Sequence, residues 1–142
     1  MTVGGCDMVT GVGTDIIDIS RVRRLWSDHC DHLENDLLTA SEYKRFRAII
    51  DDTNCESAEP DRATWFLATR LAVKEAAFKA LGAPRIPAFN WCDIEVLGDS
   101  DLSIRVSGEL GNAMKETNCP SFVASVKCDG RFCLAFVIGV TT

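Results

Sequence analysis

The chain of 142 residues has no long hydrophobic run, and this absence excludes a helix that crosses a membrane. Such a helix needs about 20 consecutive apolar residues, and the longest apolar stretch, Phe132–Val140, has about half that length. The N-terminal sequence MTVGGCDMVTG lacks the basic start and apolar run of a secretory signal. We therefore expect a cytoplasmic protein that does not act at a membrane.

The sequence also has few histidines and no cysteine pair with the spacing typical of a metal site. There are only two histidines, His29 and His32, in the segment expected to be the first helix, and the seven cysteines form no CxxC pair. Zinc ligation is therefore not predicted, and the odd cysteine count argues against a disulfide framework, so we expect most cysteines to be reduced. The net charge of −6 lacks the basic excess typical of nucleic-acid-binding proteins.

The composition predicts one compact domain over residues 1–142, with residues 1–8 flexible and 51–60 forming an acidic surface loop. Period-2 and helical patterns predict strands at 9–19, 93–97, 102–106, 122–126 and 131–140, and helices at 20–33, 42–50, 61–81 and 107–117. Hairpins mixed with helices, without a strict βαβ repeat, indicate an α+β domain. Its largely antiparallel sheet should pack around the long helix.

Local motifs explain several of these boundaries. Ser20 is suited to cap the first helix, and Thr39 with Glu42 matches a capping box, which gives Glu42 a structural role. Gly82 should end the long helix. Gly11 and Gly13 predict that the middle of the first strand passes close to another segment.

Two carboxylates stand in apolar or small-residue surroundings: Asp15 in the first strand and Glu75 in the long helix. Magnesium typically uses one or two protein carboxylates and takes its other oxygens from water and phosphates. Three cations on the long helix, Arg70, Lys74 and Lys79, offer donors for a pyrophosphate. Spacing alone does not decide between a metal and pyrophosphate site and an ordinary helix surface, since pairs such as Glu75 and Lys79 also stabilise exposed helices.

A family resemblance favours the metal and pyrophosphate site over ordinary helix-stabilising pairs. The blocks GVGTDIIDISRVRRL, LTASEYKRF, FLATRLAVKEAAFKALG and FNWCDIEV resemble, in order and spacing, the holo-acyl-carrier-protein synthase family of 4′-phosphopantetheinyl transferases. They cover Gly11–Val96, and the tail from RVSGELGNAM is more weakly similar. The resemblance implies transfer of the 4′-phosphopantetheine group from coenzyme A to a serine of an apo acyl carrier protein. The products would be the holo-carrier protein and adenosine 3′,5′-bisphosphate.

The resemblance also implies a role for individual residues. Asp15 and Glu75 are expected to hold Mg²⁺, and Glu75 or a water on the metal to take the serine proton. Catalytic residues would be Asp15, Lys74 and Glu75; coenzyme A contacts would be Arg70, Lys74, Lys79, Gly82 and Arg85. Arg21 and Arg24 would dock the acidic helix of the carrier protein, and three chains would form a homotrimer with coenzyme A between subunits.

The sequence departs from the family pattern in two places. The segment Gly82-Ala83-Pro84-Arg85 replaces a Gly-Thr-Gly type loop, and Pro84 cannot donate a backbone hydrogen bond. The final strands also lack the histidine found in many members. These departures keep open a catalytically silent trimer that binds coenzyme A or a carrier protein, and an unrelated α+β domain with chance charges.

Overall fold

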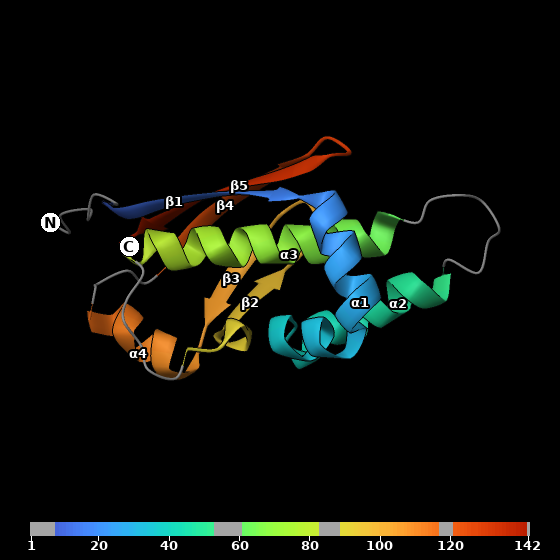
Figure 1. The fold of residues 1–142 in the computed structure, drawn as a ribbon. Coiled ribbons are helices and arrows are strands. Elements are labelled where there is room, and N and C mark those ends of the chain that lie inside the picture. The colour runs from blue at the N-terminus through green and yellow to red at the C-terminus, as the bar shows by residue number, and fades with distance from the viewer. Residues whose placement is uncertain (1–7, 53–60, 83–88, 117–120, 142) are drawn as a thin grey trace, which may run out of the picture.

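A computed structural model describes residues 8–52, 61–82, 89–116 and 121–141. Most of the predicted flexible start and most of the predicted acidic loop lie outside this part of the chain, as does Arg85. Helix α3 (Asp61–Ala80) is the central element, with a sheet along one side and the remaining elements on the others (Figure 1). No helix in the described ranges is long and apolar enough to cross a membrane.

The larger sheet contains β1 (Val9–Asp18), β5 (Phe132–Val140) and β4 (Ser121–Cys128), in the order β1-β5-β4. Both pairs of neighbours are antiparallel. Side chains alternate between the two faces of a strand. One face packs on α3 through buried residues such as Ala135 and Val137, which gives the domain its principal core.

Two glycines of β1 allow the strand to lie directly on the backbone of α3. A Cβ atom on Gly11 would overlap the carbonyl oxygen of Ala80, and one on Gly13 would overlap that of Ala76. The predicted close approach of this strand is therefore confirmed, and the neighbouring segment is α3. Only residues without a side chain permit this separation.

The other elements cover the remaining sides of α3. Helices α1 (Ile19–Leu37) and α2 (Ala40–Asp52) lie at the end where α3 begins (Figure 1). A short 3-10 helix (Trp91–Asp93) leads into the antiparallel hairpin of β2 (Ile94–Leu97) and β3 (Ser103–Val106). Helix α4 (Gly108–Glu116) follows this hairpin. The α+β class with antiparallel sheets is confirmed.

Details at the helix ends differ from the sequence expectations. The N-cap of α1 is Asp18 instead of Ser20, because the Asp18 carboxylate accepts hydrogen bonds from both the backbone N–H and the hydroxyl of Ser20. The helix continues past residue 33 to Leu37, with a kink at His29. The capping box of α2 is confirmed: the Thr39 N–H donates to Glu42 at 2.8 Å, and the Glu42 N–H donates to the Thr39 hydroxyl at 3.3 Å.

A disulfide that the sequence analysis does not predict lies among the described cysteines. Cys128 and Cys133 form a disulfide that links β4 to β5. They are direct cross-strand partners, with their Cα atoms 4.1 Å apart. Sequence spacing does not reveal this pairing, because it depends on the register of the hairpin. Cys30 and Cys92 are free.

The outer face of the larger sheet is apolar and exposed. Its exposed hydrophobic side chains come from all three strands: Val12, Ile16, Val123, Leu134 and Phe136. The strand register aligns them in adjacent rows, with Ile16 opposite Leu134 and Phe136 beside Ser125. Contiguous apolar surface of this kind marks an interaction site more often than ordinary surface.

Candidate functional site

Asp15 and Lys79 meet where β1 crosses the last turns of α3. The alternation of β1 turns Asp15 toward the helix, and the Lys79 ammonium donates to Asp15 Oδ1 at 2.7 Å. The same ammonium donates to the backbone carbonyl of Thr14 at 3.1 Å. The Asp15 side chain is 15% exposed, whereas that of Lys79 is 45% exposed. The carboxylate is thus held by the fold, and the lysine remains accessible.

Glu75 lies one helical turn before Lys79 and is half-buried. Its pKa is raised above the ordinary value, first by burial and then by the negative charge of Asp15, while Lys79 partly offsets both effects. The Asp15 charge therefore acts directly on Glu75. The structure brings together the two predicted metal ligands and one predicted coenzyme A contact, from β1 and α3.

These residues fit a divalent cation. Two carboxylates face a single lysine, and Asp15 Oδ2 is buried with no hydrogen-bond partner among the described residues. The described ranges contain no cluster of three or more histidine, cysteine, aspartate or glutamate side chains that would form a closed metal cage. Magnesium needs no such cage, because it keeps several waters and binds substrate phosphates. Asp15 and Glu75 would hold the ion, which would neutralise phosphate charge.

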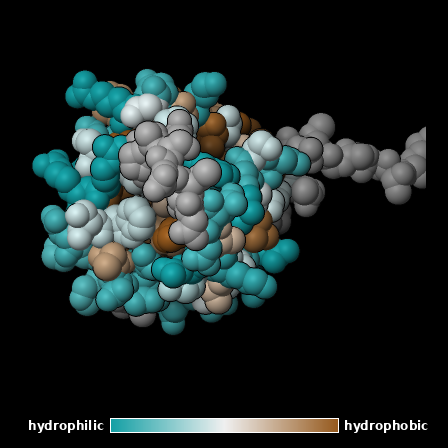
Figure 2. All heavy atoms as spheres, turned by 90° about the vertical axis from the view of Figure 1, so that its right-hand side faces the viewer, coloured by the Kyte–Doolittle hydropathy of each residue, from teal (hydrophilic) through white to brown (hydrophobic). Residues whose placement is uncertain are grey.

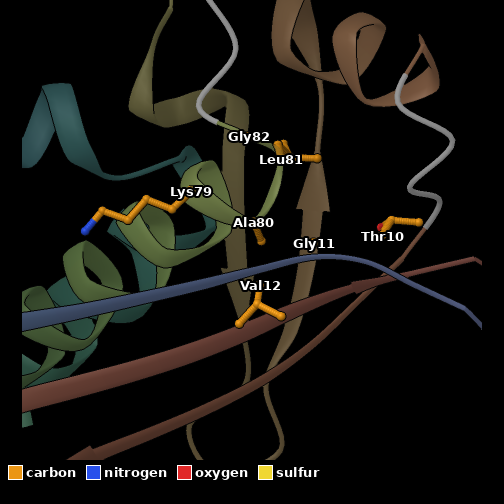
Figure 3. A pocket seen from close by; sticks show the side chains of 7 residues that line it. All are labelled: Thr10, Gly11, Val12, Lys79, Ala80, Leu81 and Gly82. Atoms are coloured by element: carbon orange, nitrogen blue, oxygen red, sulfur yellow. The ribbon is translucent and has the colours of Figure 1, made fainter.

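Two cavities flank this group. One, of about 240 Å³, lies beside the end of α3 and is lined by Thr10, Gly11, Val12, Lys79, Ala80, Leu81 and Gly82 (Figure 3). Gly82 ends the helix as predicted, in a left-handed conformation with φ of +79°. In Figure 3 the Lys79 side chain extends away from Thr10, with its nitrogen farthest from that residue. Lys79 therefore links the cavity to Asp15.

The second cavity, of about 340 Å³, extends from Glu75 toward the start of α1. Its lining is mainly apolar and includes Ile17, Leu71 and Phe132, with Arg21 at the α1 side. Arg24 is exposed one turn further along α1. The end of the molecule that carries α1 and α2 is predominantly hydrophilic, with hydrophobic residues in small separate areas (Figure 2). Of the two predicted docking arginines, Arg21 thus borders the apolar cavity and Arg24 is exposed close to it.

Lys74, which is expected to contact the pyrophosphate of coenzyme A, lies away from this group in the single chain. Its side chain is fully buried, and its ammonium donates to Glu42 Oε2 at 2.7 Å and to the Trp91 carbonyl at 3.3 Å. It also donates to the Leu37 carbonyl. Adjacent helix residues point about 100° apart, so Lys74 and Glu75 face different neighbours. In the single chain, the role of Lys74 is structural.

Arg70 is also separated from Asp15 and Glu75. Its buried guanidinium donates to the Gly98 carbonyl at 2.8 Å and lies 3.5 Å from Asp99. Arg45 pairs with the same Asp99 carboxylate at 2.6 Å. Both arginines line a third cavity, of about 220 Å³, between α2, α3 and the β2–β3 turn. The structure thus places the predicted helix cations at two different locations.

Sequence reasoning missed the full role of Glu42. Besides its cap, this carboxylate accepts from the Val96 N–H at 2.9 Å and pairs with Lys74. It thereby ties α2 to α3 and β2. The only sequence signal was the capping box, which does not reveal contacts to distant segments. His29 and His32 are exposed.

Comparisons with known proteins identify the family to which this fold belongs. Residues 11–137 match the model of the 4′-phosphopantetheinyl transferase superfamily, so the chain belongs to that family. It is 34% identical to a holo-acyl-carrier-protein synthase of Alkalilimnicola ehrlichii, with 92% of this chain and 96% of that protein covered.

Comparisons with solved structures support the same family. The chain resembles the holo-acyl-carrier-protein synthase of Neisseria meningitidis with a TM-score of 0.76 and 25% identity, covering 93% of this chain and 98% of that one. It also resembles a Bacillus anthracis holo-acyl-carrier-protein synthase in complex with coenzyme A (3′,5′-ADP). That comparison gives a TM-score of 0.70 and 25% identity, with 95% and 99% of the two chains covered.

Proposed function

We propose that this chain transfers the 4′-phosphopantetheine group of coenzyme A to a serine of an apo acyl carrier protein, in a reaction that requires Mg²⁺. The observation that carries the proposal is the group formed by Asp15, Glu75 and Lys79 at the junction of two cavities. Phosphoryl transfer needs charge neutralisation and positioning more than covalent chemistry by the protein. Two carboxylates and one lysine between the two cavities meet that need.

The cavities suggest how coenzyme A lies across the site. The pyrophosphate would bind at the carboxylates and Lys79, and its nucleotide end would extend toward Gly82. The pantetheine arm would enter the mainly apolar cavity bordered by Leu71 and Phe132. An acceptor serine that approaches over α1 would then meet the β-phosphate beside Glu75. Glu75 or a water on the metal would accept the serine proton there.

Arg70 fits this scheme only if neighbouring chains share the site. We propose a homotrimer in which each coenzyme A lies between two subunits, so that the Arg45 and Arg70 pair of one subunit serves the nucleotide end in the next. The exposed apolar face of β1, β5 and β4 is the surface available for assembly. Arginine pairs are well suited to phosphate groups.

The acceptor would dock on the start of α1. Arg21 lines the cavity that contains Glu75, and Arg24 continues the basic surface one turn later. An acidic helix on the carrier protein would complement these charges and bring its serine to Glu75. Arg23 is not needed for this contact, since it projects from another side of the helix.

Intact mass spectrometry tests the reaction directly. The purified protein is mixed with coenzyme A, Mg²⁺ and an apo acyl carrier protein, with EDTA in a parallel sample. The proposal expects a phosphopantetheine-sized mass gain on the carrier that EDTA abolishes. Coenzyme A binding without mass gain on several carriers would contradict transfer and indicate a binding protein of this fold.

A further inference from the structure

Lys79 occupies a position that conflicts with metal binding at Asp15. Its ammonium is 2.7 Å from Asp15 Oδ1, which is one of the oxygens offered to the cation. Positive charges that share one carboxylate repel strongly at such separations. The protein without metal therefore carries an internal counter-cation at its own candidate metal site.

The same lysine can leave this position at low cost. Its side chain is 45% exposed, and a flexible four-carbon stem carries the ammonium. It also lines the cavity at the end of α3, beside Gly82 (Figure 3). Lys79 can thus pair with Asp15 or with an anion in that cavity, but its one charge cannot serve both fully.

We propose that Lys79 neutralises Asp15 in the metal-free protein and moves to the pyrophosphate of coenzyme A when the metal binds, so that metal and coenzyme A bind cooperatively. This inference rests on the proposed function. It extends that function by making Lys79 an exchangeable counter-ion as well as a substrate contact. Either ligand alone must separate Lys79 from Asp15, whereas the second ligand finds this separation already made. Such coupling is reciprocal between the two ligands.

The test measures metal binding without using catalysis. Free Mn²⁺ is followed by electron paramagnetic resonance for the wild type and for Lys79→Gln, each with and without saturating coenzyme A. Without coenzyme A, Lys79→Gln should bind Mn²⁺ about fivefold more tightly, the size expected for loss of a partly exposed ion pair. The factor by which coenzyme A tightens Mn²⁺ should fall by about fivefold in the variant.

Two variants make the result specific. Lys44→Gln removes the same charge from an exposed position on α2 and should leave both Mn²⁺ affinities unchanged. Asp15→Asn should weaken Mn²⁺ binding in the wild-type and Lys79→Gln backgrounds alike, which locates the ion at Asp15. Circular dichroism of each variant checks that the fold is retained.

The outcomes separate this inference from the proposed function. Equal Mn²⁺ affinity of the wild type and Lys79→Gln would overturn the counter-ion role, even if the enzyme transfers phosphopantetheine. Tighter Mn²⁺ binding with unchanged coupling would show that Lys79 only repels the ion and does not move, which also overturns the exchange. Absence of coenzyme A binding by the wild type would contradict the proposed function and the coupling, while the metal-only comparison would still decide whether Lys79 competes with the ion.

Discussion

Helix α3 carries two charged groups on different faces, and they differ in how completely their charges are satisfied. On one face, Lys74 and Glu42 are fully buried, with backbone donors and acceptors completing their hydrogen bonds. On the other, Asp15 and Glu75 share a single accessible lysine, and Asp15 Oδ2 has no partner in the part of the chain that the structure describes. The group of Lys74 and Glu42 is therefore closed to solvent, whereas the group of Asp15, Glu75 and Lys79 is open to it.

This difference shows that two adjacent residues of one motif can have different roles. Lys74 and Glu75 are neighbours in the sequence, but the closed group holds α3 to α2 and β2, whereas the open group faces the cavities. Burial lowers the pKa of Lys74, although Glu42 opposes that shift, and burial raises the pKa of Glu75. Loss of charge should therefore cost stability at the closed group and activity at the open group.

The largest effect is expected for Glu75→Gln. Loss of this carboxylate should reduce the transfer rate by about a thousandfold or more, because it removes a metal ligand and the candidate base. Stability without metal should be unchanged or higher. A raised folded-state pKa means that ionised Glu75 opposes folding once the pH exceeds that pKa, and glutamine removes this penalty. Phosphopantetheine incorporation and urea unfolding at neutral pH measure the two quantities. Retained activity would remove Glu75 from the site.

Lys74→Met should break the closed group. The change removes the nearer cation of the buried Glu42 carboxylate and leaves it with the Arg70 guanidinium, whose Nε lies 3.9 Å away. This should cost about 3 kcal/mol of unfolding free energy, the lower end of the range for a broken buried ion pair. Urea unfolding measures this loss. Adding Glu42→Gln should recover part of it, because the unpaired charge is removed. Lys79→Met is the matched change on the open face and should cost less than about 1 kcal/mol. A similar loss for both lysines would contradict the distinction between the two groups.

A moderate effect is expected for Arg21→Glu/Arg24→Glu. The reversal should weaken productive encounter with the carrier protein by about tenfold at low salt, and the difference should shrink as salt increases. Coenzyme A affinity should fall by less, although Arg21 borders the cavity proposed for the pantetheine arm. Steady-state kinetics with varied carrier concentration, together with calorimetry for coenzyme A, separates the two. Lys44→Glu/Arg47→Glu on α2 gives the same charge change at other exposed positions and controls for net charge.

The smallest effect concerns Asp99, beside the closed group. Its pKa is lowered chiefly by a hydrogen bond from Arg45. A lowered pKa contributes stability above the unfolded-state value of about 3.8, and this contribution is lost as the pH falls through the folded-state pKa. Asp99→Asn should therefore cost about 0.5 kcal/mol at neutral pH, reduced by the exposure of this side chain. The cost should shrink in acid unfolding series once the pH falls below the unfolded-state value, and it should disappear below the folded-state pKa. A pH-independent difference would point to packing instead.

The sequence predicted the order of strands and helices well, because turns and caps are local. Gly82 ended α3, and Thr39 with Glu42 capped α2, through contacts between near neighbours. The prediction of Ser20 as a cap was wrong, because the hydrogen bond from the Ser20 N–H to the Asp18 carboxylate identifies Asp18 as the N-cap.

The candidate site was predictable only in part. Asp15 and Glu75 were conspicuous as carboxylates in apolar segments, but the orientation of Lys74 and Arg70 was not encoded in their spacing. Helix α3 is buried on nearly every side, so no polar stripe shows which face meets the core. The counter-ion role of Glu42 depends on a partner 32 residues away, beyond the reach of periodicity.

The glycines of β1 determine how mutable the site is. Gly13 lies two positions before Asp15 and touches the helix at Ala76, the neighbour of Glu75. A methyl group at Gly13 would push strand and helix apart, and with them the two carboxylates. Activity therefore depends on glycines that take no part in the reaction, because they lack a Cβ atom. A search for inactivating variants should include substitutions at these glycines.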